Sequence, residues 1–287
     1  MALIPAVVLT YDANHRYALH MIRLYERLWP DHPFQFHIPF QGVDRLPGGA
    51  ALGARIQMRA TPGAIRQTVL TLLDQFDDDQ WIYWCVDDKY PLSLDTAYLR
   101  ALSRAVLTRS LPGIDGICFC RARKLRDGRA LMTGRSGLWK VAFCPSVGFL
   151  FRRSDYSQIW LHQFVRVRVL RSLFASCPDA VNSAKELDGL KDRIPLPDSH
   201  RIFVTRGHHA SFGESSSRGV VTANCAASML REGIEPPGSG GVPAQHITIG
   251  DDAAGLNPGL CWRDLRSILA FGMASSLLRL KRCCPFR

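Results

Sequence analysis

Apolar residues in the first half of the chain alternate between two spacings. Short runs rich in β-branched and aromatic residues, typical of buried strands, occur at 6–10, 34–40, 55–59, 81–86 and 114–120. Between these runs, apolar positions recur at helical spacing over 14–29, 62–73 and 94–108. Strands and helices that alternate in this way predict a mostly parallel central sheet with helices on both faces and right-handed crossovers.

Polar residues mark where these helices begin and end. Pro30 ends the first helix, and Thr61 and Pro62 are suited to be the N-cap and first residue of the second. Asp95 falls in the first turn of the third helix, where the helix dipole favours an acidic side chain. The first half is therefore predicted to be a Rossmann-like α/β unit.

The pattern changes after residue 120. A basic segment rich in turn formers covers 121–135, and two short strands are expected at 138–143 and 146–152. These strands predict an antiparallel edge added to the parallel sheet. Beyond them the sequence predicts two helices and a late strand, at 156–174, 180–191 and 201–205.

Composition divides the chain into three parts. The compact α/β domain is predicted to cover 1–232, followed by a Gly/Pro-rich linker at 233–260. Residues 261–287 are predicted to form a basic amphipathic helix, because several apolar residues share one helical stripe and basic residues crowd its end. Two interpretations of this helix stand open: it lies on an anionic membrane surface, or it packs on its own domain or a partner.

The net charge of the chain limits the classes of partner that it is expected to bind. A formal net charge of +11 attracts partners that carry phosphate, which include nucleotides, nucleic acid and anionic lipid. The sequence contains no RRM, KH, zinc-finger or helix-turn-helix signature. Nucleic acid is therefore not an expected partner.

Cysteine usage and the N-terminal segment bear on localisation. The nine cysteines are an odd number without a C-x-x-C pair, which favours buried free thiols in a reducing compartment. The apolar start of the chain leads straight into Tyr11 and Asp12, so it is interpreted as a strand rather than a signal peptide. No run approaches the ~18 apolar residues that a spanning helix needs. We expect a cytoplasmic protein, peripheral on the inner membrane face if 261–287 binds lipid.

Two predicted strand ends carry candidate chemistry. Thr10–Asp12 follow the first strand, and Asp87, Asp88 and Lys89 follow the fourth. In open α/β sheets, ligands bind outside the carboxyl ends of the strands. Paired carboxylates at such an end are suited to a divalent cation that clamps a diphosphate. The alternative interpretation is a solvated surface turn.

The order of these elements resembles a known family. A strand leading into Tyr11 and Asp12, then helix, strand, helix and an aromatic strand ending in Asp87 and Asp88, is similar to the nucleotide-binding half of GT-A type glycosyltransferases. That family belongs to the Rossmann-like nucleotide-diphospho-sugar transferase superfamily. The similarity covers about residues 5–155 and, loosely, 180–232, and it implies a GT-A fold and a nucleotide-sugar donor.

The resemblance also implies roles for single residues. In that family the first strand and its loop contact the nucleoside, and an acidic D-x-D-like motif engages a metal ion and the donor diphosphate. Thr10, Tyr11 and Asp12 would then lie at the nucleoside, and Asp87 and Asp88 at the diphosphate, with Asp88 as ligand of Mn²⁺ or Mg²⁺. Lys89 stands where the second acid of the motif belongs. Metal-assisted transfer and neutralisation of the diphosphate by Lys89 therefore both stay open.

Other candidates lie in the second half of the chain. Glu186 and Asp188 are predicted general bases for an acceptor hydroxyl, and solvated helix charges are the equally weighted alternative. His208 and His209 follow the strand at 201–205, where a histidine is suited to be a base, a late metal ligand or a phosphate contact. Arg121 follows the fifth strand and would face the same anionic ligand, unless it is simply solvated.

The sequence therefore predicts a glycosyltransferase. It would move a sugar from a nucleoside diphosphate sugar to a glycan, lipid-linked or small-molecule acceptor. The alternative is a non-catalytic nucleotide-sugar or glycan-binding protein on the same fold, because fold does not fix function. A basic nucleic-acid binder is the third and weakest hypothesis. Sequence motifs of P-loop, dinucleotide-binding and G-x-S-x-G hydrolase proteins do not occur.

Overall fold

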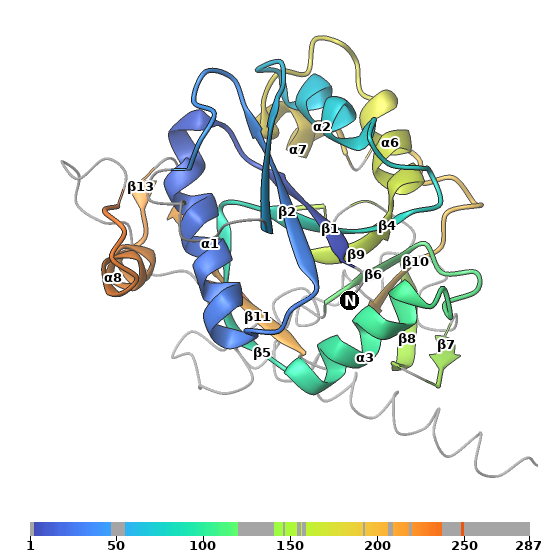
Figure 1. Ribbon diagram of the computed structural model, residues 1–287. Helices are drawn as coiled ribbons and strands as arrows, with labels where there is room; N and C mark the ends of the chain where they lie inside the picture. Colours follow the sequence, from blue (N-terminus) through green and yellow to red (C-terminus); the bar gives the residue numbers. More distant parts are fainter. Residues whose placement is uncertain are drawn as a thin grey trace, which may run out of the picture.

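A nine-stranded mixed sheet forms the centre of the protein (Figure 1), with the strand order β3-β2-β1-β4-β9-β6-β10-β8-β7. The computed structural model describes residues 3–46, 55–119, 141–145, 147–153, 156, 159–191, 193–205, 209–217, 220–236 and 248–249. Four of the eight strand pairings in this sheet are parallel and four are antiparallel. Seven of the nine strands nevertheless run in one direction, which confirms the predicted mostly parallel α/β fold.

The first half of the chain builds the parallel part of this sheet. Strands β3, β2, β1 and β4 are neighbours in that order and all run parallel. Helix α1 connects β1 to β2, and α2 lies between β3 and β4. The bounds are β1 (Ile4–Leu9), α1 (His15–Leu28), β2 (Phe34–Phe40), β3 (Ile56–Ala60), α2 (Ile65–Leu73) and β4 (Trp81–Val86).

Side chains of successive strand residues pack on opposite faces of the sheet. On β1, Ala6 and Val8 belong to the core that also contains α1, whereas Val7 and Leu9 belong to the core that contains α2. Helix α3 (Thr96–Leu107) packs with α1, and α6 (Val167–Ala175) packs with α2. Helices thus cover both faces, as predicted.

The second half adds mixed strands. Strand β9 (Gln163–Arg166) lies between β4 and β6 (Gly116–Cys118) and is antiparallel to both. Strand β10 (Ile202–Thr205) follows β6 in parallel. The antiparallel pair β8 (Gly148–Arg153) and β7 (Val141–Cys144) closes that side. This pair confirms the predicted antiparallel edge.

Two details of the predicted helices are wrong. The helix predicted over 156–174 is replaced by β9 and the shorter α6, because residues 163–166 pair with strands on both sides. Helix α2 begins at Ile65 rather than after Thr61, whose backbone amide instead donates to Phe40 O (2.9 Å) and prolongs the pairing at the end of β2. Asp95 is the N-cap of α3, where its side chain accepts from the Tyr98 amide (3.1 Å).

A smaller layer that was not predicted lies on the α1 side of the sheet. Strand β5 (Lys89–Leu94) pairs antiparallel with β11 (Ala210–Glu214), and helix α8 (Ala223–Arg231) buries Cys225 and Met229 in the same core as α1. The remaining elements are η1 (Asp12–Asn14), α7 (Ala184–Leu190), β12 (Ser216–Ser217), β13 (Val220–Val221) and β14 (Thr248–Ile249). Helix α7 lies within the helix predicted at 180–191.

Several predictions concern residues outside the described part of the chain. These are the basic segment 121–135, most of the linker and the helix at 261–287, so a membrane-surface role and the cytoplasmic location stay predictions. None of the helices that the structure describes is long and apolar enough to cross a membrane. The five described cysteines are buried free thiols, as predicted: Cys85, Cys118, Cys144, Cys177 and Cys225.

Candidate functional site

The strand order places a ligand site between β1 and β4. The connections from β1 to β2 and from β3 to β4 carry helices on opposite faces of the sheet, so the topology reverses between β1 and β4. In open α/β sheets, ligands bind outside the carboxyl ends at such a switch point. Leu9 pairs with Val86, and the Asp87 amide donates to Leu9 O (3.2 Å). The two strand ends predicted to carry chemistry therefore lie side by side.

Asp87 faces the protein rather than solvent. Only 5% of it is exposed, and Thr10 Oγ1 donates to its Oδ2 at 2.6 Å. Burial and the adjacent Asp88 raise the pKa of Asp87 to about 7, although hydrogen bonds from Thr10 and Asn14 act in the opposite direction. Asp87 therefore joins the end of β1 to the end of β4 from within.

A Thr10→Val variant tests this joint. Because valine keeps the shape of threonine but removes the donor to a buried carboxyl group, the free energy of unfolding should fall by about 1–2 kcal/mol. Urea unfolding at pH 7 measures it. Thr108→Val is the matched control, since Thr108 is exposed and donates only within its own helix and turn; it should change stability by less than about 0.5 kcal/mol. Equal effects of the two substitutions would mean that the hydrogen bond from Thr10 to Asp87 does not stabilise the fold.

Asp88, Lys89 and Glu214 form a row of three charges. Lys89 Nζ lies 2.8 Å from Asp88 Oδ2 and 2.7 Å from Glu214 Oε1. The lysine side chain is 4% exposed, whereas that of Asp88 is 37% exposed. Burial lowers the pKa of Lys89, but the two carboxylates outweigh burial and leave that pKa above its ordinary value. The ammonium group is therefore charged and faces two carboxylates rather than open solvent.

Sequence reasoning missed Glu214. It pairs across the strands with Lys89, because β11 runs antiparallel to β5 in that register. The Ser215 amide also donates to Asp88 O (2.7 Å), which fixes the turn between β4 and β5. No local pattern around Glu214 indicates this contact, which joins residues 125 positions apart.

Asp12 holds a loop in place, and Tyr11 is exposed. The Asp12 carboxylate accepts backbone hydrogen bonds from Gln41 (2.9 Å), Gly42 (2.7 Å) and Val43 (3.0 Å), at the end of β2. Burial acts to raise the pKa of Asp12, but these hydrogen bonds lower it below its ordinary value. Tyr11 is 53% exposed beside this loop. Of the three residues predicted at the nucleoside, Tyr11 offers the largest accessible surface.

A buried network that was also missed supports the end of β4. His162 Nε2 lies 3.0 Å from Val86 O, and its Nδ1 lies 2.7 Å from the Tyr25 hydroxyl, which is 2.8 Å from the Tyr83 hydroxyl. Burial lowers the pKa of His162 to about 3, so the ring is neutral. Because Nε2 faces a carbonyl it must donate, and Nδ1 then accepts from Tyr25. The network fixes the residue directly before Asp87.

The two predicted general bases differ in their surroundings. Glu186 Oε2 accepts from the backbone amides of Asn182 (2.8 Å) and Ser183 (3.0 Å), in a capping box that lowers the pKa of Glu186. Asp188 is 58% exposed, and its Oδ1 accepts from the Trp160 indole (2.6 Å) and lies 2.9 Å from Lys191 Nζ. Trp160 precedes β9, which runs antiparallel to β4, so Asp188 lies toward the carboxyl end of β4. Both roles stay predictions.

His209 is not brought to the switch point. Its Nδ1 lies 2.9 Å from Asp95 Oδ2, and its ring stacks on Tyr98 at 3.5 Å. His209 directly precedes β11, in which Ala210 pairs with Leu94 of β5 and Glu214 pairs with Lys89. At a strand rise of about 3.4 Å per residue, His209 lies roughly 17 Å along the strand from the position of Lys89. His208 and Arg121 lie outside the described residues.

The described residues do not fit a divalent cation at Asp88. Asp88 Oδ2 faces Lys89, while its Oδ1 is enclosed by protein and has no hydrogen-bond partner. Asp87 is buried against Thr10. Among the described residues, no group of three or more His, Cys, Asp or Glu side chains is arranged to hold a metal ion.

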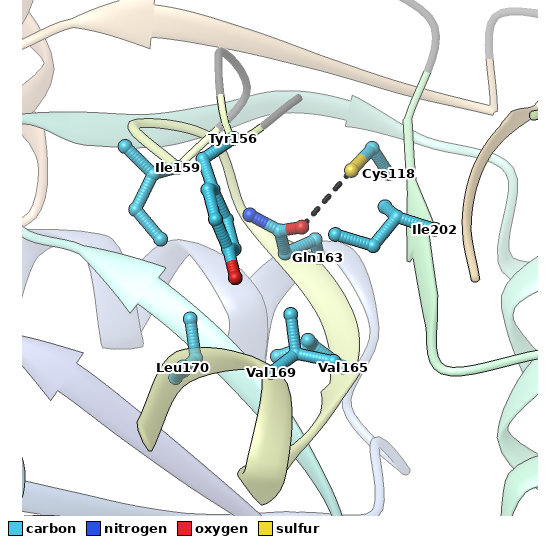
Figure 2. A pocket seen from close by; sticks show the side chains of 8 residues that line it. All are labelled: Cys118, Tyr156, Ile159, Gln163, Val165, Val169, Leu170 and Ile202. Carbon is cyan, nitrogen blue, oxygen red and sulfur yellow. Dashed lines mark hydrogen bonds between the residues drawn. The ribbon is translucent and has the colours of Figure 1, made fainter. Parts of the chain in front are cut away.

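Two cavities lie elsewhere. Figure 2 shows a small, mostly apolar cavity between α6 and the sheet, where the Cys118 thiol is 2.9 Å from Gln163 Oε1. Its lining includes Tyr156, Leu170 and Ile202. A second hollow lies at the amino ends of β1 and β4, beside Asp77–Asp79. Neither cavity opens at the switch point.

Comparison with known proteins returns structural similarity alone. No family model matches the chain, and no curated protein matches its sequence. The galactosyltransferase LgtC, in complex with donor and acceptor sugar analogs, is 14% identical with a TM-score of 0.37, over 67% of this chain and 71% of that chain. An active-site mutant of LgtC is 13% identical with a TM-score of 0.39, over 69% and 72% of the two chains. S. aureus TarS 1-349 is 12% identical with a TM-score of 0.42, over 73% of this chain and 59% of that chain.

Proposed function

We propose that this protein is a glycosyltransferase that uses a nucleoside diphosphate sugar as donor. One observation carries the proposal: an acidic pair lies at the topological switch point of an α/β sheet, next to an exposed aromatic ring. Asp87 and Asp88 end β4 there, and Tyr11 follows the neighbouring β1. This position is where open α/β sheets bind nucleotides.

The surroundings of these residues suggest a division of labour. Tyr11 presents the surface on which a nucleobase can stack. Asp88 is the accessible carboxylate and is assigned to the sugar diphosphate, where a carboxylate accepts hydrogen bonds from sugar hydroxyls. Asp12 and Asp87 hold the loop after β2 and the end of β4. They are therefore assigned to positioning rather than to direct contact with the donor.

Asp188 is the better supported of the two predicted bases. Its carboxylate is exposed and oriented by the Trp160 indole, whereas Glu186 uses an oxygen to cap its own helix. In an inverting transfer, the base accepts the proton of an acceptor hydroxyl while that oxygen attacks the anomeric carbon. The bond from that carbon to the diphosphate breaks, and the nucleoside diphosphate leaves. The acceptor class stays a glycan, a lipid-linked glycan or a small molecule.

A donor screen on the full chain tests the proposal. We expect one family of nucleotide sugars, among UDP-, GDP- and CDP-linked sugars, to raise the melting temperature and to be slowly hydrolysed. Tyr11→Ala should weaken binding of that donor, whereas Leu230→Ala, at another exposed apolar site on α8, should not. Binding without any turnover, with and without added acceptors, would support the non-catalytic binding protein instead. No binding by any nucleotide sugar would overturn both.

A further inference from the structure

The row Asp88–Lys89–Glu214 contains its own cation. The Lys89 ammonium group lies 2.8 Å from one carboxylate oxygen and 2.7 Å from the other. A divalent cation that bridged Asp88 and Glu214 would have to occupy this same place. Lys89 is 3% exposed, and moving its ammonium group into solvent would break both ion pairs.

The remaining oxygens at the end of β4 offer no second place for a cation. Asp88 Oδ1 is enclosed by protein, and Asp87 accepts a hydrogen bond from Thr10 in the interior. Mg²⁺ demands near-octahedral oxygen coordination and usually keeps several waters, so it needs accessible oxygens. The Asp88 and Glu214 side chains are 37% and 22% exposed, and each already has one oxygen within 2.8 Å of Lys89 Nζ.

We propose that Lys89 is the permanent cation of this site, and that the protein binds its donor without a divalent metal ion. The first part stands on the ion pairs alone, whereas the second rests on the proposed glycosyltransferase function. Lys89 acts through the two carboxylates that it holds, so it is a positioning residue. Its charge offsets that of Asp88 and lowers the repulsion that a diphosphate would meet beside a lone carboxylate.

Strand pairing explains why a lysine can fill this position. Lys89 and Glu214 lie directly opposite in the antiparallel pair, where opposite charges stabilise a sheet. Breaking a buried pair by removing one partner leaves an uncompensated charge. Lys89→Met would therefore leave Asp88 and Glu214 as two close carboxylates without a counter-ion. Such a pair is the arrangement that attracts a divalent cation.

A Mn²⁺ titration followed by electron paramagnetic resonance tests the first part without any nucleotide. The wild type should show no saturable Mn²⁺ site, and Lys89→Met should bind Mn²⁺ at least about tenfold more tightly. Adding Asp88→Asn to Lys89→Met should remove the gain. Arg100→Met is the matched control, because Arg100 on α3 forms an exposed pair with Asp31 and its loss should create no site. A saturable wild-type site that Asp88→Asn abolishes would overturn the proposal.

Calorimetry on the wild type tests the second part, even if Lys89→Met does not fold. The affinity for UDP, GDP or CDP, whichever binds, should agree within about twofold in EDTA and in Mn²⁺, because the fixed ammonium needs no metal. Binding more than about tenfold tighter in Mn²⁺ would overturn it. If none of these nucleotides binds, the proposed function fails, while the Mn²⁺ titration still decides whether Lys89 fills the cation position.

Discussion

An Asp88→Asn variant is expected to turn over the donor about 100-fold more slowly than the wild type while keeping its fold. Asp88 is the accessible member of the acidic pair, and we propose that it is the one that contacts the donor. Asparagine keeps the size of the side chain but removes the charge. Lys89 retains Glu214 as a partner at 2.7 Å, so the substitution does not leave a buried ammonium group unpaired.

The measurement is donor turnover and melting temperature of both proteins at saturating acceptor. Asp198→Asn is the matched control, because Asp198 is exposed and lies just before β10. It is therefore at the amino ends of the parallel strands, whereas the switch point lies at their carboxyl ends. Asp198→Asn should leave turnover unchanged. If Asp88→Asn instead keeps turnover within about twofold of the wild type, Asp88 does not contact the reacting donor, and the site must be assigned elsewhere.

Sequence patterns predicted the part of the fold in which each helix or strand carries its own periodicity. Strand β4 is bulky on both faces, with Tyr83 in one core and Trp84 in the other, as expected of the buried strand predicted there. Its carboxyl end then had to carry Asp87 and Asp88. Their meeting with Thr10 follows from parallel pairing of β1 and β4, which the alternation of strands and helices already implies.

The segment after Tyr156 shows where the same reasoning fails. Apolar residues over 156–174 satisfy helical spacing, yet Phe164 and Val165 point into opposite cores as strand residues do. A four-residue strand cannot be distinguished from a helical turn by its own periodicity. The pairing of β9 with β4 and β6 decides its conformation, and those partners lie far away in the sequence.

The charged row at the site was unpredictable for a related reason. Lys89 was singled out because it replaced an expected acid, but its partner Glu214 depends on β5 pairing with β11. Tyr90, Leu92 and Leu94 alternate with other residues along β5, but Pro91 among them argues against a paired strand. The register of two unpredicted strands therefore determines whether Lys89 faces solvent or two carboxylates, and with it the charge that a donor encounters.

Asp87 is expected to make the stability of the protein depend on pH. An unfolded aspartate ionises with a pKa of about 3.9, whereas burial and the neighbouring Asp88 raise the pKa of Asp87 to about 7 in the folded protein. The folded state therefore binds a proton more tightly than the unfolded state. The stabilising contribution is complete below about pH 4 and is lost as pH rises through about 7.

Asp87→Asn should remove this dependence, because asparagine is neutral at every pH and can still accept the hydrogen bond from Thr10. Between pH 5 and pH 8, these pKa values correspond to a loss of about 2–3 kcal/mol of unfolding free energy in the wild type relative to Asp87→Asn. Urea unfolding of both proteins at the two pH values measures the difference. Asp198→Asn should follow the wild type at both, since its side chain is exposed. Parallel pH profiles for the wild type and Asp87→Asn would mean that Asp87 ionises normally. The carboxyl group that contacts Thr10 would then be deprotonated at pH 7.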